Sequence, residues 1–255
     1  MTRYKLTRES ILDGSLRAAS QALLGPHAPR YLTDEERSRQ IEETLEEAPD
    51  PDCIWVFGYG SLMWNPAFYF AERRTARIYG YHRQFCLWAR AGRGSPQRPG
   101  LMLGLEPGGS CNGVAYRIAP ELVRSELDVL WRREMNSDSY RPVWVQARTA
   151  EGTVPVLTFA VNRSHERYIG DLDLESTVRY LANGAGPLGP CCEYLFETVA
   201  HLRSLGVRDR HLELLEAQVR RYCEASAPAP FEAGETPPPA ATSADAVGTP
   251  VTSSE

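Results

Sequence analysis

The apolar residues of the first fifty positions recur at the three- and four-residue spacing of an amphipathic helix. The stripe consists of Ile11, Leu12, Leu16, Ala19 and Leu23. Thr33 and Glu36 then match a capping box, which predicts a second helix that ends before Pro49. We therefore expect residues 1–52 to form an N-terminal helical extension that covers the main domain and carries no chemistry.

From Cys53 to Val161 the pattern changes to short apolar runs separated by glycine, proline and asparagine. The runs predict strands at 76–88, 100–105, 112–118, 141–148 and 154–161. Five or six strands of this length suit a closed or strongly curled sheet. One helix interrupts them, with Pro120 in its first turn and a broad apolar stripe behind it.

Helical periodicity returns beyond Asp171, at 174–182, 192–205 and 209–223, with a loop rich in glycine and proline at 184–190. Residues 53–225 are therefore predicted to form one α+β domain, a curled or closed mixed β-barrel with surrounding helices. Residues 226–255 hold six prolines and no Lys or Arg, and their apolar content is too low to offset the entropy of ordering. They predict a disordered tail.

The 255 residues carry a formal net charge of −5 and a pI of about 5.7, which argues against binding to nucleic acid or to an anionic membrane. The six cysteines form no Cys-x-x-Cys pair and no zinc spacing with the five histidines, so we expect no metal. No apolar run reaches membrane-spanning length and no signal peptide is evident. These features predict a cytoplasmic protein with reduced thiols.

One interval departs from the acidic balance, because residues 73–98 contain seven arginines and no Asp or Glu. The arginines are Arg73, Arg74, Arg77, Arg83, Arg90, Arg93 and Arg98. Strand arginines commonly face solvent and pair with acids elsewhere in the fold. The alternative is a positive wall for an anionic small molecule. The sequence leaves both interpretations open.

The stretch 54–64 joins a buried strand to a Gly-Tyr-Gly-Ser loop. Glycine tolerates positive φ and lets a ligand approach the backbone, so successive amides in this loop can form a nest for a carboxylate or phosphate. An ordinary turn is the alternative interpretation. A dinucleotide-binding fingerprint fits poorly, because Met63 stands where its third glycine belongs.

Two glutamates fall on the apolar side of the helix after Pro120. Glu134 projects between Val123 and Leu127, and Glu126 between Leu122 and Leu130. A carboxylate in such a place is paired, has a raised pKa, or works in catalysis. Pairing of Glu134 with Arg132 or Arg133 is the structural alternative, and the helical wheel does not choose between the two glutamates.

Seven blocks of sequence, in order, resemble the ChaC family of glutathione-specific γ-glutamylcyclotransferases. They are 56–66, 80–87, 99–103, 113–117, 131–135, 186–189 and 193–196, so that the similarity covers residues 53–222. The resemblance implies a γ-glutamylcyclotransferase-like mixed barrel. It implies that the loop of Val56, Phe57, Gly58, Tyr59, Gly60 and Ser61, with Leu62, binds the γ-glutamyl group. It also assigns the proton acceptor to Glu134 and, near the site, matches Tyr140 and Tyr194 to family tyrosines.

The implied reaction converts reduced glutathione into 5-oxoproline and cysteinylglycine through attack of the substrate's own α-amine, so no cofactor is expected. Amides around Gly60 and Ser61 would hold the α-carboxylate, and Arg90 or Arg93 would meet the glycyl carboxylate. Three alternatives are a cyclotransferase for other γ-glutamyl amines, a non-catalytic anion sensor, and a nucleic-acid-binding protein that uses the arginine interval.

Overall fold

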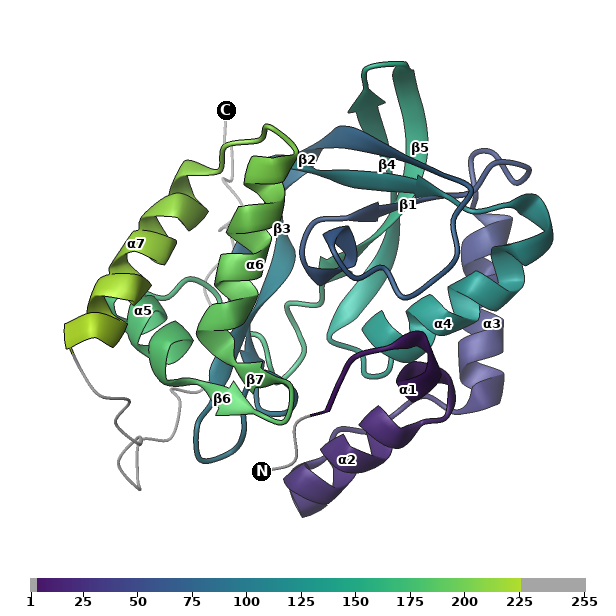
Figure 1. Ribbon diagram of the computed structural model, residues 1–255. Coiled ribbons are helices and arrows are strands. Elements are labelled where there is room, and N and C mark those ends of the chain that lie inside the picture. The colour runs from purple at the N-terminus through teal and green to yellow at the C-terminus, as the bar shows by residue number, and fades with distance from the viewer. Residues whose placement is uncertain (1–3, 226–255) are drawn as a thin grey trace, which may run out of the picture.

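The computed structural model describes residues 4–225, and its centre is a closed β-barrel (Figure 1). The strands are β1 (Trp55–Gly58), β2 (Glu72–Ala89), β3 (Gly100–Arg117), β4 (Tyr140–Thr149) and β5 (Gly152–Val161). Their order is β1-β3-β2-β4-β5, and β1 closes the barrel by pairing in parallel with β5 at Val56 and Leu157. The other strand pairs are antiparallel, so the predicted α+β mixed barrel is confirmed.

The prediction of two separate strands at 100–105 and 112–118 is wrong, because β3 runs through both without a break. Gly108 and Gly109 adopt left-handed φ angles of 99° and 70°, and Gly80 on the paired strand has a φ of 86°. The register of β2 against β3 shifts between Tyr79 and Tyr81. The glycine run therefore bends the two long strands together and does not end either of them.

Helices gather on two sides of the barrel (Figure 1). One group is α5 (Leu174–Asn183), α6 (Cys191–Ser204) and α7 (Arg210–Ala225), which confirms the three predicted C-terminal helices. A short hairpin of β6 (Ala185–Gly186) and β7 (Gly189–Pro190) joins α5 to α6. On the other side lies α4 (Val123–Glu134), which follows a 3-10 turn at Pro120–Leu122.

The N-terminal extension packs against α4 (Figure 1). It contains α1 (Arg8–Leu12), α2 (Ser15–Leu24), a 3-10 turn at Gly25–His27 and α3 (Asp34–Glu46). The predicted first helix is divided in two, because Gly14 adopts a left-handed φ of 73° between α1 and α2. The capping box of Thr33 and Glu36 opens α3 as predicted. The division of the chain at residue 52 stays a prediction, and the predicted tail at 226–255 lies outside the described residues.

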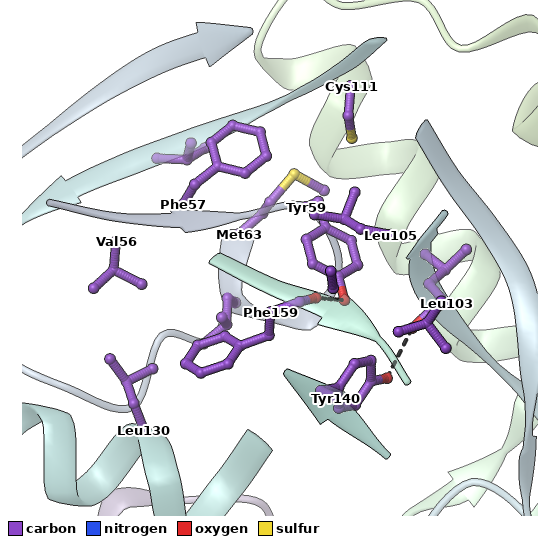
Figure 2. Close-up of a cluster of buried hydrophobic side chains, with 14 of the residues drawn as sticks. Val56, Phe57, Tyr59, Met63, Leu103, Leu105, Cys111, Leu130, Tyr140 and Phe159 are labelled. Carbon is purple, nitrogen blue, oxygen red and sulfur yellow. Dashed lines mark hydrogen bonds between the residues drawn. The ribbon is translucent and has the colours of Figure 1, made fainter. Parts of the chain in front are cut away.

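The barrel core is built from apolar side chains that the strands direct inward (Figure 2). Val56 and Phe57 are fully buried there. The Tyr59 hydroxyl donates to the Phe159 carbonyl at 2.9 Å, and the Tyr140 hydroxyl donates to the Leu103 carbonyl at 2.8 Å (Figure 2). Each buried phenol is thus satisfied by backbone, as burial of a polar group requires.

Between residues 4 and 225 no helix has both the length and the apolar character needed to cross a bilayer. Over the same residues no three His, Cys, Asp or Glu side chains come together in a group that could hold a metal ion.

Candidate active site

The Gly-Tyr-Gly-Ser loop leaves β1 at Gly58 and turns at once into a 3-10 helix, Ser61–Met63. The Met63 amide donates to the Gly60 carbonyl and the Asn65 amide to the Ser61 carbonyl, both at 2.9 Å. The buried Tyr116 hydroxyl reaches the Leu62 and Met63 carbonyls at 3.0 and 2.9 Å. These bonds fix the loop as a rigid turn on the end of the barrel.

Both glycines of the loop pack closely against neighbouring atoms, and neither Gly58 nor Gly60 has a positive φ. A Cβ at Gly58 would lie 2.8 Å from the Leu62 Cβ. A Cβ at Gly60 would lie 2.6 Å from the Tyr194 hydroxyl oxygen. The prediction of positive φ at these two glycines is therefore wrong. The prediction that a ligand approaches the backbone here stays a prediction, and the atom close to Gly60 in the structure is the Tyr194 hydroxyl oxygen.

Glu134 is the last residue of α4 and lines a cavity of about 240 Å³ together with Ser61 and Tyr140. Its side chain is 18% exposed and its Oε1 lies 2.9 Å from the Arg133 Nε. Arg133 also donates from Nη2 to the Ser61 hydroxyl oxygen at 2.8 Å and from Nη1 to the carbonyls of Asn65 and Pro66. One guanidinium therefore connects the loop to the carboxylate.

Burial raises the pKa of Glu134, and the charge and hydrogen bond of Arg133 oppose that rise. The carboxylate also stands at the negative, C-terminal end of a helix, which disfavours its ionised form. The net direction is upward. Glu134 is thus protonated more easily than an ordinary surface glutamate.

Three tyrosines surround the same carboxylate. Burial raises the pKa of Tyr59, Tyr140 and Tyr194, and the charge of Glu134 adds to the rise in each case. Tyr194 lines a second cavity of about 730 Å³, and Ser61 lines both cavities. The ring of Tyr194 lies 5.7 Å from the ring of Trp64. The structure therefore brings Ser61, Glu134, Tyr140 and Tyr194 together.

The remaining residues of the predicted binding loop lie behind the cavity walls. Val56 and Phe57 are fully buried, Tyr59 is 7% and Leu62 5% exposed, and none of them lines either cavity. Gly58 packs directly against Leu62. Their binding role stays a prediction, and the geometry supports contact through Ser61 and the adjoining backbone, with the other side chains holding the turn.

Glu126, the other glutamate on the apolar side of α4, has a different environment. It is 1% exposed and makes a bidentate ion pair with Arg8, whose Nη2 lies 2.8 Å from the Glu126 Oε1. Its Oε2 also accepts the Tyr69 amide at 2.9 Å. Glu126 lines neither cavity. Its contacts fasten α1 of the extension to α4.

Three of the seven arginines of the interval, Arg74, Arg83 and Arg93, follow the ion-pairing interpretation and pair with carboxylates. Arg74 pairs with Glu72 and Glu151, and Arg93 pairs with Glu193 at 2.7 Å. The buried Arg83 donates to the Tyr59 carbonyl at 2.5 Å, which holds the loop from behind. Arg90 differs from these, because it lines the cavity of Glu134 and its side chain has no partner among residues 4–225.

Two contributions to the cavity were not predicted from the sequence. The extension supplies a wall, including Tyr4, Leu6, Arg17 and Tyr31, so its predicted role as a cover without chemistry is incomplete. An apolar stripe predicts that one face of a helix is buried, and it does not predict which part of the protein that face packs against. The second omission is Arg167, which lies in an irregular segment after β5 where no periodic pattern singles it out.

The barrel and its helices place the chain in the class of γ-glutamylcyclotransferase-like folds. The crystal structure of a yeast γ-glutamyl cyclotransferase specific to glutathione superposes with a TM-score of 0.62 at 23% identity, over 67% of this chain and 97% of that chain. The glutathione-specific γ-glutamylcyclotransferase of Escherichia coli K12 is 37% identical over 85% of this chain and 93% of its own length. γ-Glutamylcyclotransferase 2-3 of Arabidopsis thaliana is 34% identical over 68% and 92%.

Residues 54–222 match the family model described as ChaC-like protein. The chain therefore belongs to the ChaC family, as its sequence blocks imply.

Proposed function

We propose that this protein cleaves reduced glutathione into 5-oxoproline and cysteinylglycine. The proposal depends on the position of Glu134. Its carboxylate has a raised pKa and faces the same cavity as Ser61, and Arg133 bonds both residues. Chains named as glutathione-specific γ-glutamylcyclotransferases are similar over most of their length. A reducing, cytoplasmic compartment is part of the proposal, and the six unpaired cysteines support it.

The substrate supplies its own nucleophile. The γ-glutamyl α-amine attacks the γ-carbonyl carbon, a new C–N bond closes a five-membered lactam, and the C–N bond to the cysteine nitrogen breaks. The attacking nitrogen loses two protons as the ammonium becomes the lactam N–H, and the cysteine nitrogen gains two as it leaves as the ammonium of cysteinylglycine. The reaction therefore needs no external oxidant, reductant or water. The protein must curl the γ-glutamyl chain to bring amine and carbonyl together, and it must relay protons from the attacking nitrogen to the leaving nitrogen.

Glu134 relays these protons in our proposal, and the first step is removal of a proton from the α-ammonium. Reference pKa values of about 4.3 for glutamate and about 8 for an α-amine make the transfer uphill by roughly 5 kcal/mol in water. Burial of Glu134 raises its pKa and so reduces this gap. Once protonated, the same carboxyl group can donate to the leaving amine of cysteinylglycine.

Arg133 and Ser61 would position the reacting groups. Arg133 holds the Glu134 carboxylate at 2.9 Å and the Ser61 oxygen at 2.8 Å. Because Ser61 accepts from Arg133, its own hydroxyl hydrogen is available to a carboxylate of the substrate. We propose that this hydroxyl, with the backbone of Gly60 and Ser61, binds the α-carboxylate, and that Tyr194 closes the other side of the loop.

A test of the function is mass-spectrometric detection of 5-oxoproline and cysteinylglycine after incubation of the purified protein with reduced glutathione. We expect the two products in equal amounts and a higher kcat/KM for glutathione than for γ-glutamyl dipeptides. Faster release from the dipeptides would favour the second candidate, a cyclotransferase for other γ-glutamyl compounds. Absence of 5-oxoproline from every γ-glutamyl substrate would contradict both candidates.

A further inference from the structure

The cavity of Glu134 holds more positive than negative side chains. Five arginines line it, and three of them are accounted for by neighbours within the protein. Arg132 pairs with Asp128 at 2.7 Å, Arg133 pairs with Glu134, and Arg17 stacks on the Tyr31 ring at 4.7 Å. Arg90 and Arg167 remain, and within residues 4–225 neither forms an ion pair with a carboxylate.

Arg167 is held firmly in place by groups that do not neutralise it. Its Nε donates to the Trp88 carbonyl at 2.7 Å and its Nη1 donates to the Ser139 hydroxyl at 3.2 Å. Its own carbonyl accepts the Trp88 amide at 2.8 Å, so the segment runs beside the end of β2. A guanidinium anchored through Nε and Nη1 keeps Nη2 free for a further acceptor.

The electrostatic surroundings of Arg167 are unfavourable. Burial lowers the pKa of Arg167, and the nearby charge of Arg90 acts in the same direction. Tyr140, Tyr31 and the exposed Glu166 oppose this shift. Two neighbouring guanidinium groups in a partly desolvated wall repel one another, and an anion bound between them would relieve both the repulsion and the desolvation.

Arg90 stands on a loop whose backbone is fixed. The Leu188 amide donates to the Gly92 carbonyl at 2.8 Å, and a Cβ at Gly186 would lie 2.1 Å from the Gly94 carbonyl oxygen. The β6-β7 hairpin therefore packs against the loop that follows β2 and fixes its backbone. Trp88 accepts a hydrogen bond from Arg167, and Arg90 lies two residues after Trp88. The same contacts therefore fix the position of Arg90 relative to Arg167.

Arg90 and Arg167 line the same cavity as Glu134 but are not bonded to its reacting groups. Arg133 is the cation that contacts both Glu134 and Ser61, and within residues 4–225 neither Arg90 nor Arg167 forms a hydrogen bond or ion pair with either of them. The α-amine and α-carboxylate of a γ-glutamyl substrate have to lie near Glu134 and Ser61. An anion between Arg90 and Arg167 would then belong to the other end of the substrate molecule.

We propose that Arg90 and Arg167 bind the C-terminal carboxylate of the substrate, and so select γ-glutamyl peptides with a free terminal carboxylate over neutral γ-glutamyl amines. The inference rests on the proposed function. It replaces Arg93, which pairs with Glu193 and lines the neighbouring cavity, as a candidate for this carboxylate. Paired guanidinium donors suit a carboxylate because they offer parallel, charge-assisted hydrogen bonds.

The test compares kcat/KM for reduced glutathione and for its C-terminal glycine amide in the wild type and in Arg90→Ala. We expect the wild type to prefer the free carboxylate by about ten- to a hundredfold. Arg90→Ala should raise KM for glutathione, leave the amide nearly unaffected, and bring the ratio of the two values close to one. Arg90→Lys should recover part of the preference.

Arg167→Lys is a second variant, chosen because a lysine keeps the charge and loses the forked hydrogen bonds. It should reduce the preference in the same direction. Arg77→Ala is the matched control, because Arg77 comes from the same interval, contacts Ser110 and Tyr79 and lines neither cavity. Its substrate ratio should equal that of the wild type.

A wild type that turns over glutathione and its amide equally well would overturn the inference and leave the proposed function standing. An unchanged substrate ratio in Arg90→Ala and Arg167→Lys would do the same. A wild type that releases 5-oxoproline from neither substrate would overturn the proposed function together with the inference.

Discussion

Two glutamates eight residues apart on one helix behave in opposite ways. Glu126 is 1% exposed and is compensated by a bidentate arginine and a backbone amide. Glu134 keeps an 18% exposed side chain, faces a cavity and has one cation beside it. Burial raises the pKa of Glu134 in spite of that cation.

The contrast supports the proposal that Glu134, and not Glu126, takes part in the chemistry. Both side chains lie on the apolar side of α4, so amphipathic position alone does not distinguish them. Both carboxylate oxygens of Glu126 accept hydrogen bonds, from Arg8 of the extension and from the Tyr69 amide. Glu134 is left with a free face toward the cavity and a pKa that favours proton exchange. In our proposal, this incomplete compensation is what suits Glu134 to exchange a proton.

The largest effect that we expect is on the chemistry of Glu134. Glu134→Gln keeps the shape of the side chain and removes the base, so kcat for 5-oxoproline release should fall by about a hundredfold to ten-thousandfold. The melting temperature should not fall by more than a few degrees, since a penalised carboxylate is removed. Steady-state kinetics and a thermal melt measure the two quantities. Full turnover in this variant would exclude Glu134 as the base.

The same substitution at Glu126 should do the reverse. Glu126→Gln leaves Arg8 without its carboxylate and turns an amide group toward a donor, which should cost about 3 to 5 kcal/mol of unfolding free energy. For a domain of this size that corresponds to a drop in melting temperature of roughly 6 to 20 °C. Well below the transition, kcat should stay within about threefold of the wild type. A kcat loss matching that of Glu134→Gln would abolish the contrast.

A smaller effect should follow from removing the cation beside Glu134. Arg133 lowers the pKa of that carboxyl, so Arg133→Met should raise it further and move the acid limb of the pH profile of kcat/KM to higher pH. At neutral pH less of the base is ionised, and activity should fall by about tenfold or more. Arg132→Met, which breaks a pair with Asp128, is the control and should leave the acid limb in place. An acid limb that moves to lower pH in Arg133→Met would contradict the assigned electrostatics.

The smallest effect that we expect concerns packing at the loop. Gly60→Ala places a Cβ 2.6 Å from the Tyr194 hydroxyl oxygen, and the resulting displacement should cost about 1 to 3 kcal/mol of transition-state binding. Tyr194→Phe removes the atom that clashes. The double variant should therefore lose less kcat/KM than the sum of the two single losses. Strict additivity would mean that the two residues do not share the site.

Much of this architecture could be predicted from the sequence. Strand alternation and helical periodicity identified the barrel segments and the C-terminal helices, because both patterns record burial on one face. They failed where glycine bends an element without ending it, at Gly108 and Gly109 in β3, and where glycine divides one, at Gly14. Local pattern does not distinguish these two uses of glycine.

Less of the candidate site could be predicted from the sequence. The wheel left Glu126 and Glu134 equivalent, because their difference lies in Arg8 and Tyr69, which are remote in the chain. The resemblance to the ChaC family selected Glu134. Arg167 reaches the cavity from an irregular segment that pairs with the end of β2, and nothing in its neighbourhood of the sequence predicts that pairing.

The most direct test of the central claim follows the fate of oxygen in the reaction. In the proposed reaction the substrate amine closes the ring, and water takes no part in breaking the amide. Glutathione should be incubated with the wild-type protein in water labelled with the heavy isotope oxygen-18, and the masses of the products should be measured by mass spectrometry. We predict 5-oxoproline without the label. Release of glutamate carrying the label would show hydrolysis and contradict the account.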